Sequence, residues 1–340
     1  MNHLSDFFLS LSTLAVLITI LLSSAPVCSA GNLSYYRINP LYRHLYNDRI
    51  PFRNRLHVYG TPVECSSFEA LRTTLHDKFT HRVLQFSIHL VYSFTFEEVG
   101  DILNQAFADV MAEDDYLMYS YRSYRYAVSG YDGDVDIDYD MEYLTTYAQE
   151  EQVSLRVAEI LAEIITESMS DEVREKAIHD WIVANVDYDM TYTEYSAYAA
   201  LFLGTTVCQG YSLLTYKMLH ETNIGVRIVE GLGGDEPHAW NLVNLCGTWY
   251  HLDVTWDDPG HYNPNAIYYT YFNKSSSEMS NDHTFDEQDY PEALISYEEG
   301  VCEGVPPSSN NEESNDEPAV AEDDSTSSGC FIMVVTMPVF

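Results

Sequence analysis

The stretch from His238 to Trp256 reads HAWNLVNLCGTWYHLDVTW and has the pattern of two strands joined by a tight turn. Cys246-Gly247 supplies the turn, because glycine accepts the positive φ that a hairpin loop needs. If the loop has two or four residues, the residue numbers of two paired residues add up to 493. His238 then pairs with residue 255, and Asp253, two residues away, is its diagonal neighbour on the same face. A three-residue loop would instead place these two side chains on opposite faces of the hairpin.

Upstream of this hairpin, Cys208 stands where a loop leads into a helix. Apolar residues with helical spacing follow it: Leu213, Leu214, Tyr216, Met218 and Leu219. The unpaired N–H groups and the positive dipole end at the start of a helix favour a thiolate over a thiol. A lone cysteine in such a run is usually a core residue, so its interpretation depends on its partners.

A cysteine, a histidine and an aspartate can divide the work of acyl transfer. The Cys208 thiolate attacks the acyl carbon, the His238 imidazolium protonates the leaving amine, and Asp253 orients the ring. The backbone N–H of Cys208 and a second donor would hold the oxyanion, with Gln209 as a candidate for that donor. Trp240 either packs the hairpin or shapes the acyl pocket.

These residues resemble the transglutaminase-like superfamily, whose core is papain-like. The spacings of 30 residues from Cys208 to His238 and 15 from His238 to Asp253 are usual for its bacterial members. The matching segments are 207–211, 238–241 and 250–259, with further support from His179-Asp180-Trp181-Ile182, Tyr188-Asp189, Tyr271-Phe272-Asn273-Lys274 and Asp282-His283. The resemblance implies an α+β fold in which the helix carrying Cys208 packs on an antiparallel sheet carrying His238 and Asp253.

The chain divides into five expected parts. Residues 1–30 resemble a signal peptide, with a retained membrane anchor or a lipid-modified Cys28 as alternatives. Residues 31–150 read as a small α+β accessory domain, and 151–300 as the catalytic domain. Residues 301–329 predict a disordered acidic tail, because they hold few large apolar side chains. The apolar segment 330–340 either attaches the protein to the cell surface or is uninformative. We therefore expect a secreted or cell-surface protein.

The charge balance restricts the partners. Lys and Arg number 16 against 53 Asp and Glu, a net charge of −37 in 340 residues. Such a polyanion repels phosphate backbones, so nucleic acid is an unexpected partner, and polypeptide substrates should be neutral or cationic. No motif typical of serine hydrolases, zinc proteases or nucleotide-binding proteins appears, and we expect neither a metal nor a cofactor.

Two further patterns leave alternatives open. Five aspartates alternate with other residues from Asp132 to Asp140, which predicts a solvated strand face rather than a calcium site. Cys65, Cys246, Cys302 and Cys330 allow three disulfide pairings or free thiols.

The sequence therefore predicts an exported thiol enzyme that transfers acyl groups from amides through a thioester. Hydrolysis, as by a cysteine protease or amidase, is slightly favoured over transfer to an amine, because water is always present. The alternative is a non-catalytic surface protein that uses the same fold for binding or as a scaffold.

Overall fold

The computed structural model describes residues 31–39, 60–260, 266–305 and 308, which all fall in one compact unit ending at Ser308. The expected signal peptide, the segment 330–340 and all of the acidic tail beyond Ser308 lie outside these residues. None of the helices found in the described ranges combines the length and the apolar character needed to cross a membrane.

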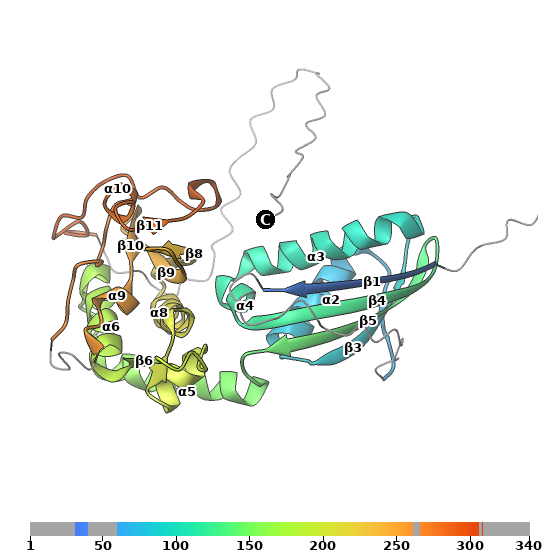
Figure 1. The fold of residues 1–340 in the computed structure, drawn as a ribbon, viewed down its shortest axis with the longest axis horizontal. Helices are drawn as coiled ribbons and strands as arrows, with labels where there is room; N and C mark the ends of the chain where they lie inside the picture. The colour runs from blue at the N-terminus through green and yellow to red at the C-terminus, as the bar shows by residue number, and fades with distance from the viewer. Residues whose placement is uncertain (1–30, 40–59, 261–265, 306–307, 309–340) are drawn as a thin grey trace, which may run out of the picture. The chain divides into compact units, whose positions relative to one another are not determined.

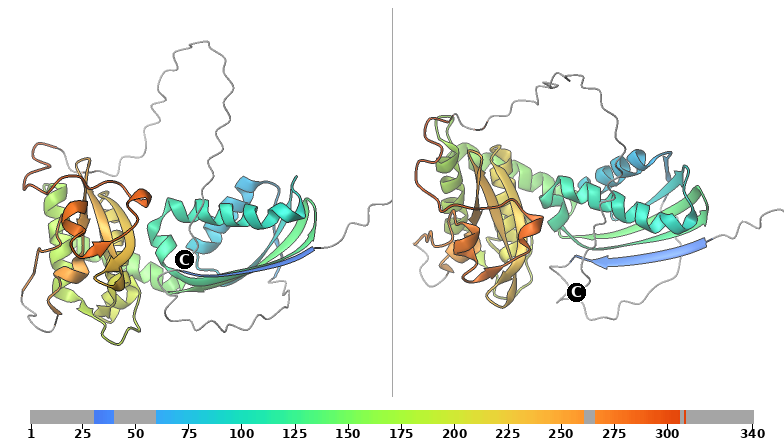
Figure 2. Two further views of the ribbon diagram at one scale, coloured as in Figure 1. Left: turned by 45° about the horizontal axis from the view of Figure 1, so that its top comes forward. Right: turned by 90° about the horizontal axis from the view of Figure 1, so that it is seen from above.

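The N-terminal sheet has five strands in the order β1-β4-β5-β3-β2 (Figure 1). Its strands are β1 (Gly31–Ile38), β2 (Val63–Cys65), β3 (Gln85–Val91), β4 (Tyr121–Tyr131) and β5 (Asp134–Tyr143), and β2 runs parallel to β3. Helices α2 (Phe68–Thr80) and α3 (Val99–Glu113) cover one face of this sheet (Figure 2). Leu75 and Phe107 from these helices share one apolar core with Ile88 and Ile137 from the strands.

The segment after residue 114 begins as a helix and continues as a strand. Residues Asp115–Tyr119 form the short helix α4, because the Asp114 side chain caps it by accepting the N–H groups of Tyr116 and Leu117. The strand β4 begins only after this turn. The 3-10 turn η2 (Phe96–Glu98) leads directly into α3.

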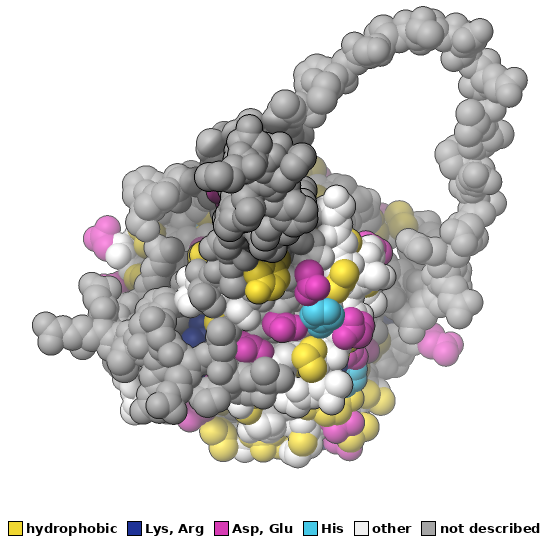
Figure 3. Space-filling view, turned by 90° about the vertical axis from the view of Figure 1, so that its right-hand side faces the viewer, with side chains coloured by type: hydrophobic (Ala, Val, Ile, Leu, Met, Phe, Trp, Pro, Cys, Tyr) yellow, Lys and Arg dark blue, Asp and Glu magenta, His cyan; other side chains and the backbone are white. Residues whose placement is uncertain are grey.

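Four of the five alternating aspartates lie on β5, where Asp134 and Asp136 are exposed and Asp140 is half-buried. Asp132 precedes this strand, in the turn between β4 and β5. Asp138 is buried and accepts a hydrogen bond from Ser87, so the face is only partly solvated. The Nδ1 atom of His89 lies 2.8 Å from Asp136 Oδ1. Figure 3 shows acidic side chains gathered around a histidine on one face of the molecule.

The C-terminal sheet has four strands in the order β10-β9-β8-β11. Its strands are β8 (Gly225–Gly233), β9 (Glu236–Leu245), β10 (Thr248–Leu252) and β11 (His283–Thr284), and all neighbouring pairs are antiparallel. Helix α8 (Cys208–Glu221) packs on β8 and β9. The expected α+β architecture, with a cysteine-bearing helix on an antiparallel sheet, is confirmed.

Further helices pack against α8. They are α5 (Tyr147–Ile164), α6 (Asp171–Asn185), α7 (Ala197–Phe202) and α9 (Val254–Asp257). The short strands β6 (Asp187–Tyr188) and β7 (Thr205–Thr206) pair in parallel beside them. The remaining elements of this part are α10 (Ser276–Met279), which contacts β10, and the 3-10 turn η4 (Glu287–Asp289). Helix α5 runs continuously through residue 150, where we expected a domain boundary.

The buried carboxylate of Asp115 connects α4 to the C-terminal sheet. It accepts hydrogen bonds from Arg227 Nε at 2.7 Å and from the backbone N–H of Ile228 at 2.8 Å, both on β8. Because this carboxylate has charged and backbone donors, it can be buried at little cost.

The structured part of the chain continues past residue 300, where we expected the acidic tail to begin. Cys302 forms a disulfide with Cys246 in the β9–β10 turn. The backbone N–H groups of Gly300 and Val301 each donate to Glu172 on α6 at 3.0 Å. Cys65 is a buried free thiol.

Candidate active site

Cys208 is the first residue of α8, as the sequence predicts, and its side chain is half-buried. The preceding residue Val207 is extended, and the helix begins directly after it. Gly210 lets this first turn approach β7, since a Cβ there would lie 1.9 Å from the Thr206 hydroxyl oxygen. The thiol therefore sits at the positive end of the helix dipole.

The hairpin register is the predicted one. Thr248 pairs with Leu245, so the loop has two residues, Cys246 and Gly247, and paired positions sum to 493. The second strand is shorter than expected, because β10 ends at Leu252 and does not extend to residue 256. Asp253 instead caps α9 by accepting the Trp256 N–H at 3.1 Å.

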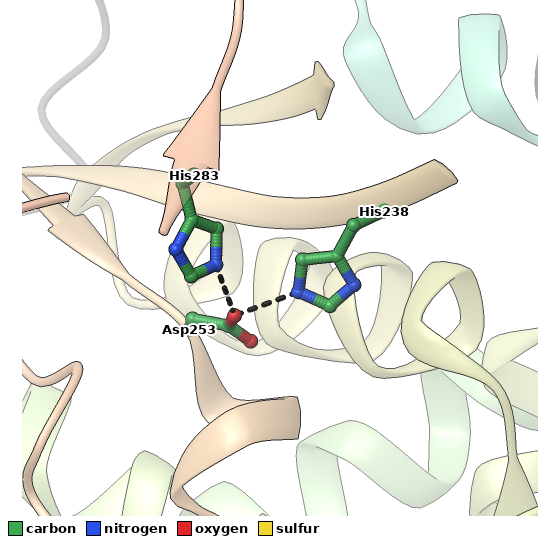
Figure 4. A group of neighbouring side chains, drawn as sticks. All are labelled: His238, Asp253 and His283. Carbon is green, nitrogen blue, oxygen red and sulfur yellow. Dashed lines mark hydrogen bonds and ion pairs between the residues drawn. The ribbon is translucent and has the colours of Figure 1, made fainter. Parts of the chain in front are cut away.

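His238 and Asp253 meet as expected (Figure 4). The Nε2 atom of His238 donates to Asp253 Oδ2 at 2.7 Å, and both side chains are buried. Burial lowers the pKa of His238, but the charge of Asp253 and a hydrogen bond with Cys208 outweigh it and raise this pKa to about 10. Burial raises the pKa of Asp253, yet His238 and His283 bring it down to about 2. The imidazolium and the carboxylate thus stabilise each other.

His283 is a member of this group that residue patterns did not assign. Its Nε2 atom lies 3.1 Å from Asp253 Oδ2, the oxygen that also accepts from His238. It reaches this position from β11, which pairs with β8 through Gly233. The pair Asp282-His283 is visible in the sequence, but Asp253 and His283 are 30 positions apart and nothing in the sequence indicates that the two side chains meet.

Trp240 is a wall of the histidine site. Its side chain is 1% exposed, and its ring stacks on His238 with centroids 5.8 Å apart. Its indole N–H donates to His251 Nδ1 at 2.9 Å. Burial and the nearby His283 lower the pKa of His251 to about 3, so His251 is neutral. The structure therefore favours packing over pocket formation for Trp240.

Gln209 is buried, and its side-chain amide donates to the Tyr119 carbonyl oxygen at the end of α4. This contact ties α8 to α4 and directs the amide away from a role as oxyanion donor. The geometry gives no support to the expectation that Gln209 stabilises an oxyanion. The first backbone N–H groups of α8, which have no partner within the helix, also lie near the thiol.

Within the described residues, His238, Asp253 and His283 are the group of possible metal ligands whose atoms lie close enough together to share an ion. Their arrangement fits hydrogen bonding better, because two imidazole N–H groups already point at one carboxylate oxygen. A cation there would have to displace both protons, so we assign no metal to this group.

A pocket of about 310 Å³ lies beside the β8–β9 pair. Its wall includes Pro237, which precedes His238, and Gly231, which pairs with His238 across the sheet. Three carboxylates also line it: Glu230, Asp286 and Asp289.

Comparison with known proteins finds a family match over the segment that holds the site. Residues 158–254 match the model of the transglutaminase-like superfamily, and this range contains Cys208, His238 and Asp253. Human kyphoscoliosis peptidase is 26% identical over an alignment of 133 residues, and the match covers 34% of this chain and 20% of the peptidase. The match thus spans about a fifth of that relative's length.

Two solved structures give partial superpositions. One is a crystal structure of a TGase, at 12% identity and a TM-score of 0.29, covering 57% of this chain and 59% of that chain. The other is a candidate cysteine protease from Cytophaga hutchinsonii, at 17% identity and a TM-score of 0.27, covering 40% and 58% respectively. Because residues 158–254 match the model of this family, the chain carries a domain of the transglutaminase-like superfamily.

Proposed function

We propose that this protein is a thiol enzyme that transfers acyl groups from peptide or side-chain amides through a thioester on Cys208. The observation that carries the proposal is the series Cys208, His238 and Asp253, in which a 2.7 Å hydrogen bond joins the buried histidine and aspartate. Cys208 is also among the groups that raise the pKa of His238, which supports the pairing of this thiol with the imidazole.

Each side chain has one part in the reaction. The Cys208 thiolate attacks the amide carbon, and the carbonyl oxygen gains the negative charge that N–H groups at the start of α8 would stabilise. His238 then gives its proton to the leaving nitrogen, the C–N bond breaks, and a thioester remains on Cys208. Asp253 holds the ring so that Nδ1 is left to face the thiol.

Hydrolysis of the thioester by water, as in a cysteine protease or amidase, is the favoured second step over transfer to an amine. Water needs no dedicated site, whereas an amine acceptor must be bound in place. The net charge of −37 and the three carboxylates of the pocket beside His238 support neutral or cationic polypeptide substrates.

The location we propose is outside the cytoplasm, either secreted or at the cell surface. The disulfide between Cys246 and Cys302 supports it, because such bonds persist in oxidising compartments.

Mass spectrometry of reactions with a mixed peptide library and a small primary amine tests the proposed reaction. We expect the wild-type protein to produce cleaved or deamidated peptides, Cys208→Ala to produce none, and Cys65→Ser to retain the activity of wild type. Cys65 is the matched control, because it is the other free cysteine among the described residues.

Two outcomes would change the proposal. Incorporation of the amine in preference to water would identify a cross-linking enzyme. Absence of any product from the wild type, with Cys208 alkylated no faster than a free cysteine, would favour the non-catalytic binding or scaffold protein.

A further inference from the structure

One carboxylate oxygen in the site accepts from two histidines. Asp253 Oδ2 lies 2.7 Å from His238 Nε2 and 3.1 Å from His283 Nε2, while Oδ1 accepts the Trp256 N–H. All three donors are fixed by different elements, β9, β11 and α9. The orientation of this carboxylate is therefore determined from three sides.

His283 lies between two carboxylates. Its Nδ1 atom is 2.7 Å from Asp282 Oδ1, and its Nε2 atom faces Asp253. A carboxylate only accepts, so both ring nitrogens need a proton to make these two bonds, and His283 is an imidazolium in this arrangement. Asp282 is itself held by the Tyr271 hydroxyl, which donates to its other oxygen at 2.6 Å.

His251 shows that the cluster distinguishes its histidines. Its Nδ1 atom accepts the indole N–H of Trp240, and its Nε2 atom lies 3.1 Å from the Ser276 hydroxyl. This pattern requires a neutral ring with the proton on Nε2. The neighbouring rings of His238 and His283, with centroids 5.5 Å apart, both face carboxylates.

We propose that His283 is a positioning residue that holds Asp253 against His238. Together with Asp282, it extends the series of Cys208, His238 and Asp253 into a chain of alternating charges. This inference rests on the proposed function. The chain runs from the Cys208 thiolate through the imidazolium of His238, the buried carboxylate of Asp253 and the imidazolium of His283. It ends at the half-exposed carboxylate of Asp282. Each charge stabilises the next, and the last reaches solvent.

Besides the members of the chain, Asp257 and Tyr271 face Asp253. His283 is faced by Asp253, Asp282, His238, the neutral His251 and the hydroxyl-bearing ring of Tyr271. Cys208 is faced by His238, Tyr188 and Tyr195. The rings of Trp240 and Trp256 cover both charged histidines and keep water from weakening their interactions.

The rate of Cys208 alkylation by iodoacetamide against pH tests the proposal in the intact protein. In His283→Gln the side chain keeps a hydrogen-bond donor but has no charge. We therefore expect the low-pH limb of the alkylation profile to move up by about one pH unit. His283→Met loses the donor as well, and kcat for peptide hydrolysis should fall roughly tenfold below that of His283→Gln, with KM little changed.

His179→Gln is the matched control. His179 is fully buried, and its two ring nitrogens also face carboxylates, those of Asp180 and Asp257. We expect this variant to lose stability but to keep the wild-type alkylation profile. A double variant tests the route of the effect: in an Asp253→Asn background, His283→Gln should leave the profile where Asp253→Asn alone puts it.

Several results would overturn the proposal. The proposal is wrong if His283→Gln has the alkylation profile of the wild type. It is also wrong if His179→Gln shifts this profile as much as His283→Gln does. If the His283 variants do not fold, nitrogen-15 NMR of the wild type at pH 6 decides, because a neutral His283 ring contradicts the chain. Failure of the proposed function is separate: the wild-type Cys208 would then react like an ordinary thiol.

Discussion

At the scale of single residues, the position of the His238 ring depends on a missing side chain. Gly233 lies on β8 opposite the start of β9, and a Cβ there would come within 3.0 Å of the His238 ring and 2.7 Å of Trp256. The two aromatic rings therefore occupy space that any other residue at this position would fill. The His238 ring thus packs against both Trp240 and Gly233.

We predict that Gly233→Ala lowers the peptide hydrolysis rate by tenfold or more. The added methyl group must push the imidazole away from its position, and small displacements of a catalytic group are costly. Gly100→Ala in α3 is the control, because its Cβ would meet its nearest neighbour, Leu33, at an ordinary 3.4 Å. Equal activities for the two variants would show that the ring has more freedom than this packing allows.

At the scale of elements, α6 carries two buried titratable residues one turn apart. Glu175 Oε2 accepts a hydrogen bond from Asn273 Nδ2 at 2.9 Å. The Nε2 atom of His179 lies 3.4 Å from Asp257 Oδ2 on α9. Burial is the main cause that raises the pKa of Glu175 to about 8, and the Asn273 hydrogen bond only partly opposes it. The helix that supports the site is thus more stable when this carboxyl group keeps its proton.

Stability should therefore fall as the pH rises. Between about pH 4.5 and pH 8 the unfolded chain has released the Glu175 proton while the folded chain still holds it, so the free energy of unfolding decreases across this window. Glu175→Gln removes this contribution. We predict that its melting temperature, measured relative to wild type, increases from pH 5 to pH 8.

The control for this comparison is Glu163→Gln, which changes an exposed glutamate on α5. Its melting temperature should follow that of wild type at every pH. Parallel curves for Glu175→Gln and wild type would mean that Glu175 is ionised in the folded protein at neutral pH.

At the scale of the whole molecule, the end of the described chain is fastened back onto the core of the site domain. The disulfide joins Cys302 to the turn of the β9–β10 hairpin, 56 residues earlier. Next to it, the Tyr297 hydroxyl donates to Glu172 on α6 at 2.9 Å. The hairpin that carries His238 is therefore linked both to this segment and, through it, to α6.

Reduction of this disulfide should lower the free energy of unfolding by about 4 kcal/mol, because opening a loop of this length frees the unfolded chain. Urea unfolding with and without dithiothreitol measures the effect. The double variant Cys246→Ser, Cys302→Ser should unfold like reduced wild type and no longer respond to dithiothreitol. A reductant effect that persists in this variant would assign it to another cysteine.

The sequence alone determined the local features of this protein. The Cys-Gly turn and the alternation on both sides of it predicted the hairpin, and a two-residue loop, which the structure shows, brings His238 and Asp253 to the same side. The loop before Cys208 and the apolar spacing after it fixed the start of α8. These features could be predicted because turn geometry and side-chain periodicity act over a few residues.

Only the tertiary structure decided which distant groups complete the site. His283 reaches Asp253 by way of β11, Trp240 turns its N–H to His251, and Gln209 is held by the Tyr119 carbonyl. The sequence also left open which cysteine pairs with Cys246 and whether Glu175 is buried. Long segments separate these residues, and packing of the whole core, rather than any local rule, selects which of their side chains meet.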